Sequence, residues 1–95
     1  MIEFLHNAIR ATAGTPIGIT ALITDDADEP IEAGCSLWLH NDNDMIAEAE
    51  PIYLGDGVWT FQLTPQQTEG LCGRFWYCIR HTNDMLCFKE PIYLI

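Results

Sequence analysis

Residues 17–24, with the sequence IGITALIT, decide the class of fold. Apolar side chains recur there at every second position, at Ile17, Ile19, Ala21 and Ile23. Successive side chains of a strand point to opposite faces, so a period of two indicates a strand with one face against a core. The segment therefore predicts a half-buried β-strand.

The same alternation recurs downstream and predicts a fold built of strands. The expected strands cover residues 35–40, 45–54, 58–63, 74–81 and 85–95. Residues typical of turns separate them at 25–30, 41–44, 55–57 and 82–84. The first nine residues fit a strand or a helix, and their β-rich surroundings favour a strand. About seven short strands with turns every 8–12 residues are typical of an antiparallel β-sandwich.

One short helical turn interrupts this pattern. Thr64 stands at an N-cap position, Pro65 at the first helical position and Gln67 at the third, which is the arrangement of a capping box. Gly70 is expected to end the helix within about two turns.

Alternation also assigns side chains to faces. The expected core consists of Ile19, Ala21, Ile23, Leu37, Leu39, Trp59, Phe61, Leu63, Phe75, Tyr77 and Ile79. The opposite faces of the same strands carry Ser36, Trp38, His40, Trp76, Cys78 and Arg80.

Two strands carry a proline, which has no backbone N–H and is therefore confined to sheet edges or bulges. Pro51 and Pro91 thus predict that 45–54 and 85–95 are edge strands. The pentapeptide EPIYL occurs in both, at 50–54 and 90–94, and predicts two strands of similar bulged geometry.

The length and the net charge of the chain limit the functions that it can have. The chain has 95 residues, enough for one domain spanning 1–95, and a formal net charge of −10 from 14 acidic and 4 basic residues. Binding to nucleic acid or to an anionic membrane is not expected, because both need clustered Lys and Arg. The first residues lack the basic segment of a secretory signal, so a cytoplasmic location is expected.

The cysteines at 35, 72, 78 and 87 are expected to be free and reduced in that compartment. Three of them, Cys35, Cys78 and Cys87, lie in apolar runs that suit small buried side chains. Their spacing contains no C-x-x-C, which argues against a zinc site even with His6, His40 and His81 available.

No catalytic, cofactor-binding or metal-binding residue is assigned. The one serine, Ser36, lies within a strand, and a Cys72–His81 nucleophilic pair would need a lowered thiol pKa that acidic surroundings do not supply. The acidic turns at 25–28 and 42–44 lack the order of oxygen ligands of a calcium loop, and the expectation is solvated turns. Calcium binding stays an open alternative.

Two other functions remain open. The acidic chain is an alternative candidate for a decoy or inhibitor that occupies a basic, DNA-binding host protein. Trp38, predicted to face outward, makes a small ligand or carbohydrate the other alternative.

The order of features between Gly14 and Tyr77 resembles a known module. Gly14-Thr15-Pro16 precedes the first strand, an acidic turn leads into Pro30-Ile31, and Gly55-Asp56-Gly57 leads into an alternating strand and a capped turn. This order resembles the immunoglobulin-like sandwich at the N-terminus of tailed-phage baseplate upper proteins, although Asp28-Glu29 stand where that acidic turn usually has a glycine. The resemblance implies an immunoglobulin-like fold, no catalytic residues, and a structural role in a virion.

We therefore expect a non-enzymatic assembly subunit of a phage tail, baseplate, neck or capsid. Its partners are other virion proteins or further copies of itself, and its location is the host cytoplasm during assembly and then the virion. Docking is expected along the predicted edge strands and through the outward tryptophan. The candidate interface residues are Trp38, Pro51, Tyr53, Tyr93, Leu94 and Ile95.

Overall fold

The computed structural model describes residues 1–6, 9–82, 84–86 and 89–95. In chain order its elements are β1 (Ile2–His6), β2 (Arg10–Ala11), β3 (Ile17–Ile23), β4 (Cys35–His40), β5 (Met45–Glu48), β6 (Glu50–Gly55), β7 (Val58–Leu63), α1 (Pro65–Thr68), β8 (Gly73–His81), β9 (Asp84–Met85) and β10 (Glu90–Leu94).

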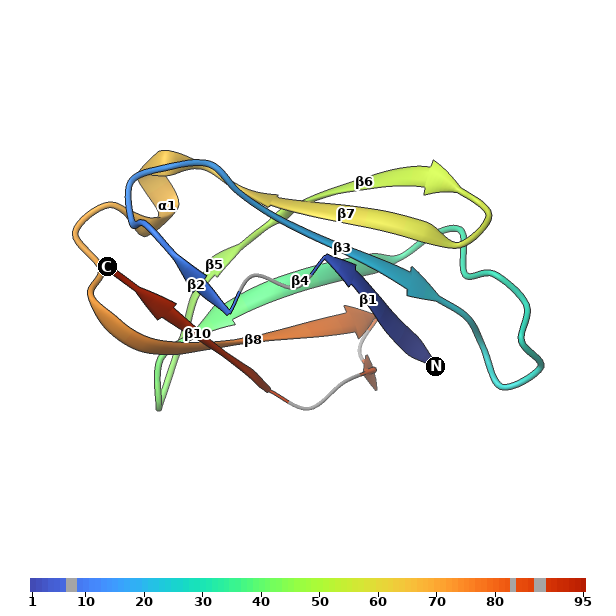
Figure 1. Cartoon of the computed structure of the whole chain (residues 1–95). Helices are drawn as coiled ribbons and strands as arrows, with labels where there is room; N and C mark the ends of the chain where they lie inside the picture. Colours follow the sequence, from blue (N-terminus) through green and yellow to red (C-terminus); the bar gives the residue numbers. More distant parts are fainter. Residues whose placement is uncertain (7–8, 83, 87–88) are drawn as a thin grey trace.

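These strands form two facing sheets (Figure 1). One sheet has the order β1-β3-β7-β6, and the other has the order β2-β10-β8-β4-β5 with β9 beside β8. Neighbouring strands are antiparallel except β10 and β2, which are parallel. The predicted all-β, mostly antiparallel sandwich is confirmed.

The core lies between the two sheets, where the alternation placed it. Ten of the eleven predicted core side chains are buried, and Phe75 is partly buried against them. The indole N–H of the buried Trp59 is hydrogen-bonded inside this layer, because Nε1 donates to the carbonyl oxygen of Ile31 at 2.8 Å. The predicted strand at the N-terminus is also confirmed as β1, and it pairs with β3.

The predicted turns form through local hydrogen bonds and left-handed backbone. Asp56 and Gly57 have φ of 52° and 81°, which the tight connection between β6 and β7 requires. The capping box of α1 is complete: Gln67 N donates to Thr64 Oγ1 at 3.3 Å, and Thr64 N donates to Gln67 Oε1 at 2.8 Å. Gly70 follows α1 with a φ of 81°.

The prediction of one strand over 45–54 was wrong. The segment divides into β5, which pairs with β4, and β6, which pairs with β7 in the other sheet. The crossover lies at Ala49, whose N–H still donates to the carbonyl of Leu37 in β4 at 2.8 Å. Both halves are sheet edges, as Pro51 predicted.

The prediction of one open edge strand over 85–95 was also wrong. The segment contains the short β9 and then β10, and β10 lies between β8 and β2. Pro91 is tolerated because β2 pairs only with the later residues Tyr93 and Leu94. Asn83 of the predicted turn and Cys87 of the predicted buried thiols lie outside the described residues.

Candidate interaction surfaces

The six predicted interface residues do not form one surface. Pro51 and Tyr53 belong to β6 in one sheet, whereas Trp38 belongs to β4 in the other. Tyr93, Leu94 and Ile95 lie at the end of β10, beside β2. The structure therefore offers three separate places: the β6 edge, the β10 end and the outer face around Trp38.

The β6 edge is open along one side, because β6 pairs only with β7. Pro51 is exposed on it, but Tyr53 is half-buried and serves the fold. Its hydroxyl accepts a hydrogen bond from Gly57 N at 2.9 Å, and its ring centroid lies 5.0 Å from that of Trp59. The apolar side chain that this edge presents is Leu54, 60% exposed, which the sequence did not single out because a register shift between Tyr53 and Gly55 turns it outward.

Leu94 must be removed from the candidate interface. Its side chain is 1% exposed and belongs to the core, whereas Tyr93 and Ile95 are 45% and 65% exposed. The backbone here is already used within the molecule: Tyr93 N donates to the Ile9 carbonyl at 2.9 Å, and Ile95 N donates to that of Ala11 at 3.0 Å. The end of β10 thus closes this sandwich with β2 and is not an open edge.

Trp38 lies on the outer face of the sheet that contains β8, and its indole is partly covered. The Arg80 guanidinium lies 4.5 Å from the ring centroid, and Nε1 donates to Glu48 Oε1 at 3.1 Å. A second tryptophan on this face is arranged in the same way: Arg74 lies 5.0 Å from the Trp76 ring, and Trp76 Nε1 donates to Asp42 Oδ1 at 3.2 Å. The structure thus adds Trp76 and the two arginines to the surface that Trp38 indicated.

A thiol and an imidazole meet on the same face, which the sequence did not indicate because they lie on different strands. Cys78 Sγ is 3.4 Å from His40 Nε2. Burial raises the pKa of the Cys78 thiol against the opposing charges of Arg80 and Lys89, and burial together with those two cations lowers the pKa of His40. A fully buried thiol with a raised pKa is a poor nucleophile. The contact therefore fits packing better than catalysis.

Cys35 and Cys72, the other cysteines that the structure describes, do not complete a nucleophilic site either. Cys35 is buried, which raises the pKa of its thiol to about 11, and Cys72 is exposed. Cys35, Cys72 and Cys78 are free. Cys72 precedes β8 and His81 ends it, so the nine residues of that strand separate the pair by roughly 30 Å.

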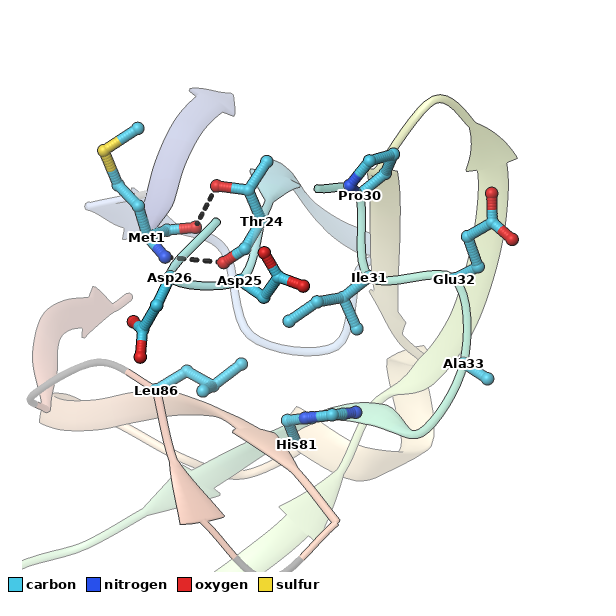
Figure 2. A pocket seen from close by; sticks show the side chains of 10 residues that line it. All are labelled: Met1, Thr24, Asp25, Asp26, Pro30, Ile31, Glu32, Ala33, His81 and Leu86. Carbon is cyan, nitrogen blue, oxygen red and sulfur yellow. Dashed lines mark hydrogen bonds between the residues drawn. The ribbon is translucent and has the colours of Figure 1, made fainter. Parts of the chain in front are cut away.

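An open hollow of about 570 Å³ lies at the end of the sandwich where β3 leads into the acidic turn (Figure 2). Ile31 and Leu86 are apolar side chains of its lining, and Asp25, Asp26, Glu32 and His81 also belong to the lining. Figure 2 shows Met1 joined to Thr24 across one side, where Met1 N donates to the Thr24 carbonyl at 2.6 Å. Among the residues that the structure describes, the lining contains no cysteine or serine. Its chemistry suits a cationic group better than nucleophilic catalysis.

Some side-chain oxygens of the acidic turns accept hydrogen bonds from backbone N–H groups of the same turn. Asp25 Oδ1 accepts from the N–H groups of Ala27 and Glu29 at 2.9 and 3.0 Å, and Asn41 Oδ1 accepts from those of Asn43 and Asp44. Among the described residues, no three His, Cys, Asp or Glu side chains are grouped so that they could hold a metal ion. No described helix has the length and apolar character needed to cross a membrane.

Comparison with known proteins identifies the fold. No protein-family model and no curated protein sequence matches the chain. Among solved structures, the crystal structure of the Lin-41 filamin domain is similar, with a TM-score of 0.74 and 7% identity over 99% of this chain and 91% of that chain. At this identity the likeness shows the fold alone, and it confirms the immunoglobulin-like sandwich that the sequence predicted.

Proposed function

We propose that the protein is a non-enzymatic structural subunit that acts by docking to other proteins. The resemblance of residues 14–77 to phage baseplate sandwiches supports a place in a virion tail, baseplate, neck or capsid. On this proposal the partners are further copies of the chain or other virion proteins.

The open edge of β6 carries the proposal. An unpaired edge offers a row of N–H and C=O groups to another strand, and a protein must either block such an edge or use it. The crossover beside it is blocked, because Gln67 Nε2 donates to the Glu48 carbonyl at 2.8 Å. Beyond that point Leu54 stands exposed at the end of the open strand, where it adds apolar contact area for an added strand.

Sedimentation velocity over a hundredfold range of protein concentration tests docking between copies. We expect concentration-dependent association that Leu54→Lys weakens, because a lysine on an exposed edge strand opposes strand addition and replaces the apolar contact of Leu54. The matched control is Leu5→Lys, since Leu5 is 55% exposed on β1, the opposite edge of the same sheet. A monomer at every concentration, or equal effects of the two variants, would contradict docking through β6.

The place in a virion is tested separately, by mass spectrometry of particles purified from a lysate of the phage that encodes the chain. We expect the protein in stoichiometric amounts. Its absence from the particles would refute the virion assignment.

A further inference from the structure

Every basic residue of the chain gathers on one face of the sandwich. The four are Arg10, Arg74, Arg80 and Lys89. Arg10 of β2 pairs with Tyr93 of β10, which in turn pairs with Arg74 of β8, so strand pairing places them side by side. Arg80 follows on the same face of β8, and both Arg80 and Lys89 lie close enough to His40 to lower its pKa.

This basic face is the outer surface of β2, β10, β8 and β4, and it also carries large aromatic side chains. They are Trp38, Trp76 and Tyr93. Arginine, tryptophan and tyrosine are the residues most enriched at the energetic centres of protein interfaces. Two carboxylates, Asp42 and Glu48, lie at its border and bond the indole N–H groups. Arg10, Arg74 and Lys89 make no ion pair with any carboxylate among the described residues.

The opposite charge gathers at one end of the molecule. Five of the 14 acidic residues lie within residues 25–32, the loop between β3 and β4. This acidic end lies at the right of Figure 1, away from α1. Asp25 is engaged in the turn itself, whereas Asp26, Asp28 and Glu29 are exposed.

We propose that the basic face of one copy binds the acidic end of a second copy. The two surfaces are complementary in charge and are both on this chain, so no other partner is needed. The general repulsion between copies of net charge −10 is screened beyond about 8 Å at physiological salt, whereas opposed charges in contact are screened less. The inference rests on the proposed assembly function and names the surfaces that perform it.

The two surfaces differ, so the contact is heterologous. After two copies bind, the pair keeps one free basic face and one free acidic end, so a heterologous contact extends into a ring or an open filament. It can act beside the β6 edge, which belongs to the other sheet.

Complementary variants test this contact. A face variant carries Arg74→Glu and Lys89→Glu, and an end variant carries Asp26→Lys and Glu29→Lys. Both also carry Leu54→Lys, which silences the β6 edge, so the result does not depend on strand addition. All four charged positions are exposed, and melting by circular dichroism confirms that each variant folds.

Each variant retains only one functional surface. The end variant, with its intact basic face, needs a partner with an intact acidic end, which the face variant supplies. We expect each alone to be monomeric in sedimentation velocity and their mixture to form a 1:1 heterodimer at least about tenfold tighter than either self-contact.

The matched control replaces the end variant by one with Glu50→Lys and Glu69→Lys, which changes net charge equally but near α1, where Glu69 is the C-cap and Glu50 lines a hollow with Pro65. Mixed with the face variant, it is expected to bind through its own intact basic face. When the control variant is mixed with the end variant, the intact acidic end of the control is likewise expected to bind the intact basic face of the end variant. Absence of a heterodimer from the face and end variants refutes the proposal, and so does undiminished self-association of either variant alone. Either result leaves docking through β6 to be decided by Leu54→Lys in the otherwise unchanged chain.

Discussion

Truncation of Leu94 tests the assignment of β10 to the interior. The sequence suggested that residues 93–95 were an apolar end available for docking, whereas the structure buries Leu94 and leaves Ile95 65% exposed. Leu94→Ala and Ile95→Ala therefore make a matched pair on adjacent residues of the same segment. Because Leu94 is buried and Ile95 is exposed, we expect the first variant to destabilise the fold and the second to leave it unchanged.

The expected magnitudes follow from burial. Leu→Ala at a buried site costs about 2–5 kcal/mol, whereas truncation of an exposed side chain changes stability by less than about 0.5 kcal/mol. Deletion of residues 93–95 also removes, besides their pairing with β8, three backbone hydrogen bonds, which join Tyr93 N to Ile9 O, Ile95 N to Ala11 O and Ala13 N to Ile95 O. At about 0.5–1.5 kcal/mol each, these three bonds alone raise the loss to roughly 3.5–9.5 kcal/mol. A domain of this size has only about 5–14 kcal/mol of stability in total.

Equilibrium urea unfolding followed by tryptophan fluorescence measures these losses, because Trp59 reports on the core. In a thermal melt, a loss of about 3 kcal/mol for Leu94→Ala lowers Tm by roughly 12–24 °C. The deletion is expected to leave the chain largely unfolded. Equal melting temperatures of Leu94→Ala and Ile95→Ala, or a native midpoint after the deletion, would contradict the burial of β10.

Four further predictions concern turns and thiols. Gly57→Ala is expected to cost about 1–3 kcal/mol in urea unfolding, since φ is 81° and an added Cβ would lie 3.0 Å from the Ile23 carbonyl oxygen; an unchanged midpoint would contradict this. Thr64→Ala removes the N-cap of α1 and is expected to cost about 0.5–2 kcal/mol, with Thr64→Asn retaining most of the stability. Native alkylation is expected to label Cys72 far faster than Cys35. Folding raises the pKa of the Cys35 thiol from 9.0 to about 11. The stability that this neutral buried thiol contributes is therefore complete below pH 9 and is lost as the pH rises toward 11. Urea unfolding at stepped alkaline pH measures this loss.

Local pattern predicted the elements whose structure depends on near neighbours. The alternation in 17–23 and 35–39 assigned both core faces correctly, because one side of each strand must be buried whatever its partner is. Thr64, Pro65 and Gln67 predicted α1 because all the capping contacts lie within one turn. These signals need no knowledge of the opposite sheet.

The basic face could not be predicted in the same way. Its four cations are at positions 10, 74, 80 and 89, and no window of sequence shows them as a cluster. Only the parallel pairing of β2 with β10 and the antiparallel pairing of β10 with β8 bring them together. The acidic end, by contrast, was visible in the sequence because its five carboxylates lie within eight residues, 25–32. The sequence therefore shows the strong negative net charge, whereas the separation of a basic face from an acidic end appears only in the folded structure.

The repeated pentapeptide EPIYL shows that the same local sequence can bury different side chains. In β10, Ile92 and Leu94 are buried and Tyr93 is exposed, whereas in β6 Tyr53 packs on Trp59 and Leu54 is exposed. The same five residues thus present opposite faces to the core. The predicted bulge is found in β6, where the register shifts, and not in β10, which pairs with β8 in continuous register.

The partners of each copy explain the difference. In β10, Tyr93 lies opposite Arg74 on the outer face; in β6, Tyr53 lies opposite Trp59, and its hydroxyl binds Gly57 in the hairpin that follows. A tyrosine is apolar along its ring and polar at its tip, so it suits either environment, and the two flanking aliphatic residues then take the other face. Which side chains of such a strand point to the core is decided by the strand that it pairs with. For this reason one copy closes the core and the other leaves Leu54 available to a partner.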